Sequence, residues 1–234
     1  MKRRLIIPAR GGSKRLPNKN IKKLNKKPLV FYTIDAAINS NKFDEIVFSS
    51  EDEKILKIVE THFKNQVYIH KRPNYLAADN SKVIDTVMEL IDDSNDQTWL
   101  SLPTSPLKLK SDFENAVDKL NVNVDGIISL TDMEFPPSLG ILTDDKGYIK
   151  DYHSSKPWQT GNTRSQDHPN VLRPNGAIYG MWTKELIKTK SFYKGKILGY
   201  YMPRERSIDI DNQFDFDLAE FLLKYYNEDW SHNI

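Results

Sequence analysis

The sequence predicts an α/β fold in which a mostly parallel central sheet lies between two layers of helices. Short apolar segments with strand character alternate along the chain with longer segments of helical spacing, and polar motifs follow several of the strand-like segments. Alternating strands and helices form parallel sheets covered on both faces, and such sheets bind ligands at the carboxyl ends of their strands. A chain of 234 residues suits one sizeable core, so a single domain over 1–234 is expected.

The first half of the chain contains four strand-like segments, each followed by a helix-like one. Residues 5–9 are apolar and bounded by charge, as buried parallel strands are. The third helix shows core spacing at Ile84, Val87 and Ile91, and Ser111 with Glu114 predicts a capping box for the fourth. Strands are expected at 5–9, 45–50, 67–70 and 99–102, and helices at 29–38, 52–63, 81–91 and 111–120.

The second half begins with a strand at 126–130, and the regular pattern then breaks from 133 to 172. Residues 139–152 predict a hairpin that turns at Asp144-Asp145-Lys146-Gly147, and a polar stretch follows. We expect this segment, called the arm below, to be either a protruding dimer arm or a mobile lid. Strands at 176–181 and 197–202 and a helix at 214–226 complete the prediction.

Charge is unevenly distributed although the net charge is only +2. Residues 1–27 contain eleven Lys or Arg and no acidic residue, which leaves 23 basic and 32 acidic residues in the rest of the chain. A concentrated positive field attracts polyanions. Nucleic acid and a nucleoside triphosphate are the two candidate ligands, and a solvated face accounts for about half of these lysines.

The sequence excludes several classes of protein and site. It has no cysteine, so disulfides and thiolate metal sites are absent. Its apolar runs are far too short to span a membrane, and the N-terminus lacks the apolar core of a signal peptide. We therefore expect a cytoplasmic protein without membrane association. Ser13, Ser105 and Ser207 have no adjacent histidine, so a hydrolase triad is not supported.

Residues 8–20, called the glycine loop below, follow the first predicted strand and read Pro-Ala-Arg-Gly-Gly-Ser-Lys-Arg-Leu-Pro-Asn-Lys-Asn. Two glycines allow backbone N–H groups to approach an anion closely, and four flanking cations add positive charge. A triphosphate requires both features. The pattern matches neither a Walker A loop nor the dinucleotide-binding motif, and a simple tight turn is the alternative interpretation.

Ser207-Ile-Asp-Ile-Asp211 follows the last predicted strand. Alternation in an extended segment places Asp209 and Asp211, called the acidic pair below, on one face. Two such carboxylates can share Mg²⁺, which prefers one or two carboxylates together with phosphate oxygens and water. The alternative is a pair of surface acids, with Asp211 as the N-cap of the last helix.

Arg173-Pro-Asn-Gly-Ala-Ile-Tyr179 places Arg and Asn beside a glycine that opens a strand. This arrangement is consistent with hydrogen bonding to a polar ligand, and a plain turn into a strand is the alternative. Arg164 lies in the preceding loop and could bind a substrate carboxylate in a bidentate manner.

These motifs, in this order, resemble those of the acylneuraminate cytidylyltransferases, also called CMP-sialic acid synthetases. The resemblance covers nearly the whole chain, and five collinear segments make coincidence improbable. The segments are Ile7–Asn20, Arg72-Pro73 with Leu76-Ala77 and Asp79, Pro103-Thr-Ser-Pro-Leu107, Arg173–Tyr179 and Ser207–Asp211.

The resemblance implies a three-layer α/β/α nucleotidyltransferase fold of the GT-A-like type, a homodimer with its dimerisation arm at about 133–172, and Mg²⁺-dependent transfer of CMP from CTP to a sugar acid. Catalytic roles are implied for Arg10, Lys14, Asp209 and Asp211, and Mg²⁺ ligation for the last two. The residues implied to bind CTP are Arg10, Gly11, Gly12, Ser13, Lys14, Lys19, Asn20, Arg72 and Ser81. Those implied to bind the sugar are Leu102, Thr104, Ser105, Arg164, Arg173, Asn175 and Tyr179.

The sequence also departs from this family. A Gln usually precedes the Pro-Thr-Ser-Pro-Leu motif and lies near the sugar, but Leu102 takes its place here, and Lys108 replaces the Arg that usually follows. Losing an amide that hydrogen-bonds a sugar alters substrate choice more than reaction type. We therefore expect the acceptor to be a nonulosonate other than neuraminic acid, such as a legionaminic- or pseudaminic-type acid, or a shorter ulosonate.

Two other functions remain open at this stage. A nucleotidyltransferase that loads another nucleotide, or that acts on a sugar phosphate, shares the fold. A non-catalytic nucleic-acid-binding module would use the basic N-terminal segment, and its binding would weaken steeply with salt.

Overall fold

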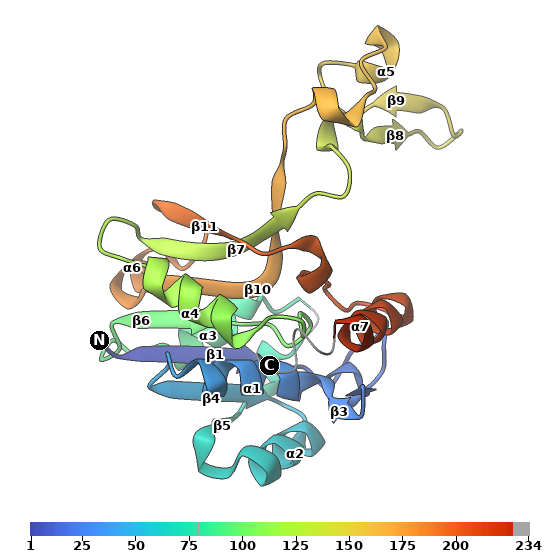
Figure 1. Ribbon diagram of the computed structural model, residues 1–234. Coiled ribbons are helices and arrows are strands. Elements are labelled where there is room, and N and C mark those ends of the chain that lie inside the picture. Colours follow the sequence, from blue (N-terminus) through green and yellow to red (C-terminus); the bar gives the residue numbers. More distant parts are fainter. Residues whose placement is uncertain (79, 227–234) are drawn as a thin grey trace.

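The computed structural model describes residues 1–78 and 80–226, and Asp79 of the family resemblance lies outside them. Its main sheet has seven strands in the order β11-β7-β10-β6-β1-β4-β5 (Figure 1). Neighbouring strands run parallel, except that β10 is antiparallel to both β6 and β7. The strands are β1 (Arg3–Pro8), β4 (Glu45–Ser50), β5 (Tyr68–Lys71), β6 (Gln97–Leu100), β7 (Gly126–Asp132), β10 (Leu172–Trp182) and β11 (Ile197–Tyr201).

Helices cover both faces of this sheet, because each strand buries its side chains alternately on the two sides. In β1, Leu5 and Ile7 join a core with α1, α2 and α4, whereas Ile6 joins a second core with α3 and α6. Strands buried on both faces are continuously apolar, as Leu5-Ile6-Ile7 is. The predicted three-layer fold is confirmed. These helices are α1 (Leu29–Ser40), α2 (Glu53–Phe63), α3 (Val83–Leu90), α4 (Lys110–Lys119) and α6 (Thr183–Thr189).

The C-terminal helix α7 (Gln213–Tyr225) lies at the edge of these layers. Its Phe216, Ala219 and Leu223 form a third buried cluster with Leu24 and Leu107. Asn212 caps the helix by accepting a hydrogen bond from the Asp215 backbone N–H at 3.1 Å, so Asp211 is not the N-cap. This leaves the Asp211 carboxylate available to the site described below.

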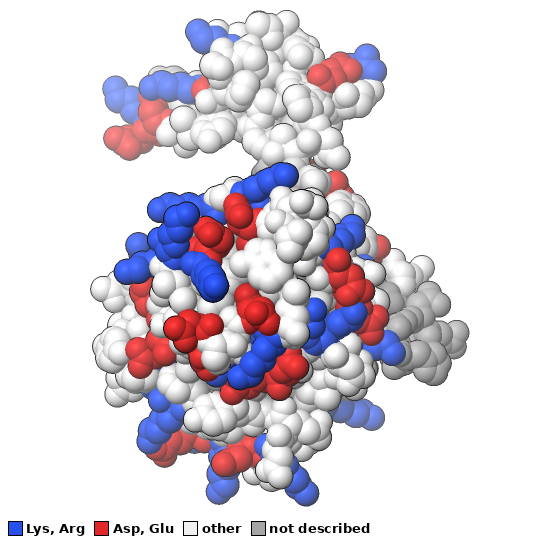
Figure 2. Space-filling model, turned by 90° about the vertical axis from the view of Figure 1, so that its left-hand side faces the viewer, with Lys and Arg blue, Asp and Glu red and all other residues white. Residues whose placement is uncertain are grey.

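The arm projects away from the sheet between β7 and β10 (Figure 1). It contains the hairpin of β8 (Ile141–Thr143) and β9 (Ile149–Asp151) and the short helix α5 (Pro157–Thr160). The predicted turn is confirmed, because the Gly147 N–H donates to the Asp144 carbonyl at 2.9 Å. Figure 2 shows the face on which the N-terminus lies, where basic and acidic side chains are interspersed and a narrow neck carries the arm.

Three details differ from the predictions. Helix α4 begins at Lys110, and the Asp112 carboxylate accepts the Leu109 N–H at 2.7 Å, so the predicted Ser111–Glu114 capping box was wrong. Strand β10 is longer than predicted and begins at Leu172. Helix α6 was not predicted. Among residues 1–78 and 80–226, no helix is long and apolar enough to cross a membrane.

Candidate active site

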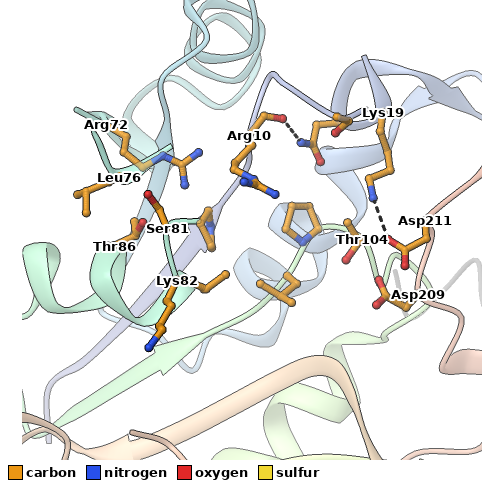
Figure 3. Close-up of a pocket in the computed structure, with 16 residues that line it drawn as sticks. Arg10, Lys19, Arg72, Leu76, Ser81, Lys82, Thr86, Thr104, Asp209 and Asp211 are labelled. Carbon is orange, nitrogen blue, oxygen red and sulfur yellow. Dashed lines mark hydrogen bonds and ion pairs between the residues drawn. The ribbon is translucent and has the colours of Figure 1, made fainter. Parts of the chain in front are cut away.

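A pocket of about 290 Å³ opens beyond the carboxyl ends of β1 and β6 (Figure 3). It brings together four of the segments singled out in the sequence. In Figure 3, Arg72 and Ser81 lie on one side, Lys19 and the acidic pair on the other, and Arg10 between them. The lining residues are Pro8, Arg10, Ser13, Lys19, Asn20, Arg72, Leu76, Ser81, Lys82, Val83, Thr86, Leu102, Pro103, Thr104, Asp209 and Asp211.

The glycine loop leaves β1 at the mouth of this pocket. A second hollow of about 320 Å³ adjoins the pocket, shares Arg10, Ser13, Lys19 and Asp211 with it, and adds Gly12 and Lys14. The two hollows, together called the cleft below, lie next to each other along the loop. Arg10, Lys14 and Lys19, which are predicted to bind phosphates, line one or both of them.

Glycine is required at position 11 by close packing. A Cβ atom built on Gly11 would lie 2.5 Å from Asp52 Oδ2, and Asp52 is held in place because it caps α2 by accepting the Lys54 N–H at 2.8 Å. At Gly12 a Cβ atom would meet nothing within 4 Å. The Gly11 N–H is also occupied, since it donates to Glu51 Oε1 at 2.8 Å.

The acidic pair is held by neighbouring backbone and charge. The Ile210 N–H, between the two aspartates, donates to the Thr104 carbonyl at 2.8 Å. Asp211 Oδ1 lies 2.8 Å from a guanidinium nitrogen of Arg15 and 3.7 Å from Lys19 Nζ. Burial lowers the pKa of Lys19, and the negative charges of Asp211 and Asp209 oppose that shift.

Asp209 is accessible from the pocket, yet neighbouring protein atoms exclude much of its water. This desolvation raises the pKa of the Asp209 carboxyl, a hydrogen bond from Thr104 acts in the opposite direction, and the charge of Asp211 raises the pKa further. A carboxylate destabilised in this way is stabilised by a cation that approaches it. Two hard oxygen donors at one wall of a phosphate-sized cleft suit Mg²⁺, which takes its remaining ligands from phosphate and water.

No group of three or more His, Cys, Asp or Glu in the described part of the chain forms a metal cluster. A metal bound at the acidic pair would take its remaining ligands from water or from phosphate oxygens. Mg²⁺ sites of this open kind, which use one or two carboxylates, are common where a nucleotide supplies phosphate oxygens.

The opposite wall comes from the segment before α3. Arg72 is 4% exposed, and its guanidinium donates to the Ala9 carbonyl at 3.1 Å and to Glu51 Oε2 at 2.6 Å. Among the described residues, Arg72 Nε and Asn20 Oδ1 are buried without a hydrogen-bond partner. A buried donor and a buried acceptor left unpaired beside a pocket are suited to a polar ligand, because leaving either unpaired costs about 1–3 kcal/mol.

Several pocket residues were missed in the sequence. Lys82, Val83 and Thr86 line the pocket from the start of α3, and Glu51, which directly follows β4, bonds two of the predicted residues. The position of Glu51 at the carboxyl end of a strand beside β1 is the signal that could have identified it.

Residues 102–108 form the floor of the pocket. Leu102 and Thr104 line it, whereas Ser105 is fully buried and donates to the Asn175 carbonyl at 3.2 Å. Lys108 is fully buried beneath them, and its Nζ donates to the Leu102 carbonyl at 2.8 Å and to Thr33 Oγ1 at 2.9 Å. Burial lowers the pKa of Lys108 to about 7, although the charges of Asp112 and Asp209 oppose this.

The remaining predicted sugar residues are not among those that line the pocket. Asn175 is buried, and its amide donates to Ser207 Oγ at 2.9 Å and accepts from Ser129 Oγ at 2.6 Å. Tyr179 is buried in β10, and burial raises its pKa above the usual range. Arg173 is exposed at the start of β10, and Arg164 lies on the arm, 3.6 Å from the Asp167 carboxylate.

Comparison with known proteins gives a consistent result. The family model described as cytidylyltransferase matches residues 5–179. The chain is 33% identical over 220 residues to N-acylneuraminate cytidylyltransferase of Streptococcus agalactiae serotype V, covering 92% of this chain and 52% of that protein. It is 32% identical over 232 residues to CMP-N,N'-diacetyllegionaminic acid synthase of Legionella pneumophila, covering 95% and 97%.

Among solved structures, the fold matches that of CMP:2-keto-3-deoxy-manno-octonic acid synthetase complexed with CTP. The TM-score is 0.68 at 16% identity, with 96% of this chain and 99% of the other covered. The chain spans about half the length of the streptococcal relative and nearly all of the Legionella relative.

Proposed function

The chain belongs to the cytidylyltransferase family, and from this premise we propose that it transfers CMP from CTP to a sialic-acid-like, nonulosonic sugar acid. The anomeric hydroxyl of the sugar attacks the α-phosphorus of CTP, the bond to the β-phosphate oxygen breaks, and pyrophosphate leaves. The observation that carries this proposal is the convergence of the cationic glycine loop and the acidic pair on one cleft.

The nucleotide would occupy the cleft along the glycine loop. Arg10 and Lys14 would stabilise the charge that develops on the leaving pyrophosphate, since fixed cations at such a position lower the barrier without reorganising. Arg72 and Asn20 offer the unpaired donor and acceptor described above. The further residues proposed to contact CTP are Gly11, Gly12, Ser13, Lys19 and Ser81.

We propose that Asp209 and Asp211 hold Mg²⁺ during the reaction. The ion would supply charge neutralisation at the phosphates and would lower the pKa of a group bound to it. The chain's own contribution is to present two carboxylates at the wall facing the glycine loop. Lys19 and Arg15 keep Asp211 in place in the absence of substrate.

The sugar acid is proposed to bind beside the floor of the pocket and the start of β10. Leu102, Thr104 and Arg173 would face it, with Ser105, Asn175 and Tyr179 supporting that wall from within the core. Because Leu102 presents a hydrocarbon where relatives of the sialic acid type are expected to present an amide, the acceptor is proposed to be a nonulosonate other than neuraminic acid, such as a legionaminic-type acid.

The arm is proposed to mediate a homodimer, which would bring Arg164 towards a sugar site. Its hairpin exposes Ile141 at 43% and Ile149 at 68%, and the register that pairs Thr143 with Ile149 places both isoleucines on one face. Contiguous exposed apolar side chains mark protein–protein contact sites. Light scattering should give a dimer mass for the full chain and a monomer mass when Ile141 and Ile149 are both changed to Ser.

The activity is tested by a product screen. The protein is incubated with Mg²⁺, one of four nucleoside triphosphates and each of a panel of nonulosonates and sugar phosphates. Pyrophosphate release is followed, and products are identified by mass. We expect a CMP-sugar from CTP alone. Release of pyrophosphate with UTP or ATP and a sugar phosphate would point to the alternative transferase, and salt-sensitive RNA or DNA binding without turnover would point to the nucleic-acid module.

A further inference from the structure

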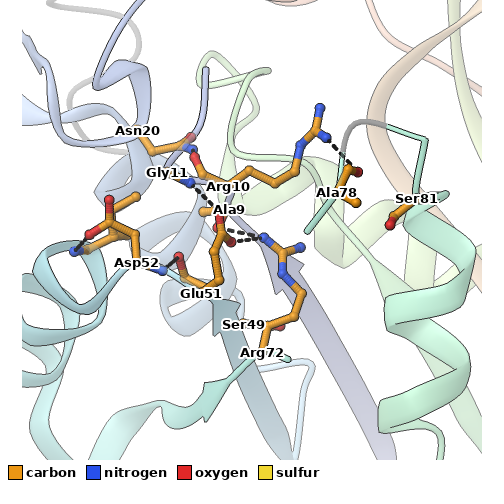
Figure 4. Close-up of polar contacts among 12 residues, drawn as sticks. Ala9, Arg10, Gly11, Asn20, Ser49, Glu51, Asp52, Arg72, Ala78 and Ser81 are labelled. Carbon is orange, nitrogen blue, oxygen red and sulfur yellow. Dashed lines mark hydrogen bonds and ion pairs between the residues drawn. The ribbon is translucent and has the colours of Figure 1, made fainter. Parts of the chain in front are cut away.

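Glu51 joins the two walls of the nucleotide cleft. It follows the last residue of β4, and its two carboxylate oxygens accept from different segments (Figure 4). Oε1 accepts the Gly11 N–H at 2.8 Å, and Oε2 accepts the Arg72 guanidinium at 2.6 Å. One carboxylate thereby fixes the distance between the glycine loop and Arg72.

The same small region is fixed by several other hydrogen bonds. Arg72 also donates to the Ala9 carbonyl at 3.1 Å, and its backbone N–H donates to the Ser50 carbonyl at 2.8 Å. On the other side of the loop, the Asn20 amide donates to the Arg10 carbonyl at 2.7 Å. The chain from 9 to 11 is thus tied on both sides, and Glu51 is the only carboxylate that bonds both this loop and Arg72 among the described residues.

Glu51 is ionised in this setting. Burial alone would raise the pKa of the Glu51 carboxyl, but hydrogen bonds from Arg72 and from the Gly11 amide outweigh burial and hold the pKa below its usual value. The Arg72 side chain is 3% exposed and that of Glu51 17%. A charged pair so well shielded from water holds its geometry more strongly than a surface pair.

We propose that Glu51 is a positioning residue for the nucleotide, which holds the Arg72 guanidinium and the Gly11 amide so that Arg72 keeps its place in the wall of the pocket. Glu51 is not itself expected to touch the substrate, because its oxygens are already occupied. The inference rests on the proposed function only in taking the ligand of this cleft to be CTP.

The test compares Glu51→Gln with Glu51→Asp. Glutamine keeps the size of the side chain but has one acceptor oxygen and one NH₂ group, so it cannot accept from both Gly11 and Arg72. Aspartate keeps the charge and both acceptors on a shorter side chain. Glu53→Gln is the matched control, because Glu53 lies two residues away with a side chain that is 78% exposed and pairs with Lys71.

We expect Glu51→Gln to weaken CTP binding, measured by calorimetry without the sugar, by about 10- to 100-fold, since a charge-assisted hydrogen bond that orients Arg72 is lost. The KM for CTP should rise by a similar factor, while kcat at saturating CTP and the KM for the sugar change less than about threefold. Glu51→Asp, whose shorter side chain displaces Arg72 but keeps the charge, should weaken CTP binding less than Glu51→Gln, by about three- to tenfold, and Glu53→Gln should behave as the wild type.

A purely structural role predicts a different pattern. It would lower the thermal midpoint of Glu51→Gln and leave the CTP affinity of the folded fraction unchanged, and that result overturns the proposal. If Glu51→Gln does not fold, Glu51→Asp decides, because the shorter side chain displaces Arg72: a CTP affinity equal to that of the wild type in the folded variant refutes the inference.

The binding measurement is repeated with ATP, GTP and UTP on the wild type and on Glu51→Gln. Binding of another nucleotide in place of CTP, weakened by Glu51→Gln, would refute the proposed substrate and leave the positioning role intact. Binding of CTP that is insensitive to Glu51→Gln would support CTP as the substrate and refute the positioning role of Glu51.

Discussion

Changing Lys108 to methionine is expected to remove a pH dependence from the stability of the protein. The Lys108 side chain is fully buried beneath the pocket, and its two hydrogen bonds, to Leu102 and Thr33, use both N–H groups of a neutral amine. Burial lowers its pKa to about 7 in the folded protein, whereas a lysine in an unfolded chain has a pKa of about 10.4.

The sign and size of the effect follow from these two pKa values. Between about pH 7 and pH 10 the unfolded chain binds a proton at this lysine and the folded protein does not, so the free energy of unfolding rises with pH. One pKa unit corresponds to about 1.4 kcal/mol. The Lys108 contribution to the free energy of unfolding should therefore increase by about 2 kcal/mol from pH 7 to pH 9.

The assay is urea denaturation followed by tryptophan fluorescence at pH 7, 8 and 9 for the wild type, Lys108→Met and the surface control Lys57→Met. Subtracting the variant from the wild type removes the contributions of all other groups, provided that unfolding is two-state. The difference between wild type and Lys108→Met should grow with pH, and the control should run parallel to the wild type. A difference that stays constant across this range would refute a lowered pKa for Lys108.

Further predictions concern the cleft. Asp211→Asn and Lys14→Ala should each lower kcat/KM by ~10²–10³ with an unchanged circular dichroism spectrum; near-normal turnover in either variant would contradict its assigned role. Asp209→Asn should raise the thermal midpoint by a few degrees in the absence of Mg²⁺, because a neutral amide replaces a carboxylate whose pKa is raised by desolvation. An unchanged or lower midpoint would argue against a destabilised carboxylate at Asp209. Gly11→Ala should destabilise the fold by about 1–2 kcal/mol in urea titrations, because the added methyl group displaces Asp52, the cap of α2. The control is Gly12→Ala. Equal stability of the two variants would show that Asp52 adjusts freely.

Most of the sheet and its helices could be predicted from apolar periodicity. The segment Leu5-Ile6-Ile7 is apolar on both faces and is buried on both. Helix α6 was missed because Thr183–Thr189 is short and buries only two of its residues, Thr183 and Leu186, which leaves too little pattern to detect. The direction of β10 was also beyond reach, since a strand has the same alternation in either direction.

The placement of two motifs could be predicted, because both follow strands of the sheet. The glycine loop and the acidic pair lie on one cleft, as expected from the order of strands. The role of Asn175 could not be predicted. The sequence of a polar residue beside a glycine is the same whether the side chain faces a ligand or, as here, bonds Ser129 and Ser207 inside the core. Glu51 was not predicted as a site residue, because a charged residue before a helix is usually exposed to solvent.

The base of the arm, where β7 and β10 pair, determines which changes in the length of the arm the fold can accept. Its two connections leave the sheet side by side, with Asp132 opposite Leu172 and Thr131 opposite Arg173 in the β7–β10 ladder. Material inserted or deleted beyond such a closed base changes no strand register. Mutation or protein engineering can thus exchange the arm for a longer, shorter or foreign segment, while the sheet and its helices keep their shape.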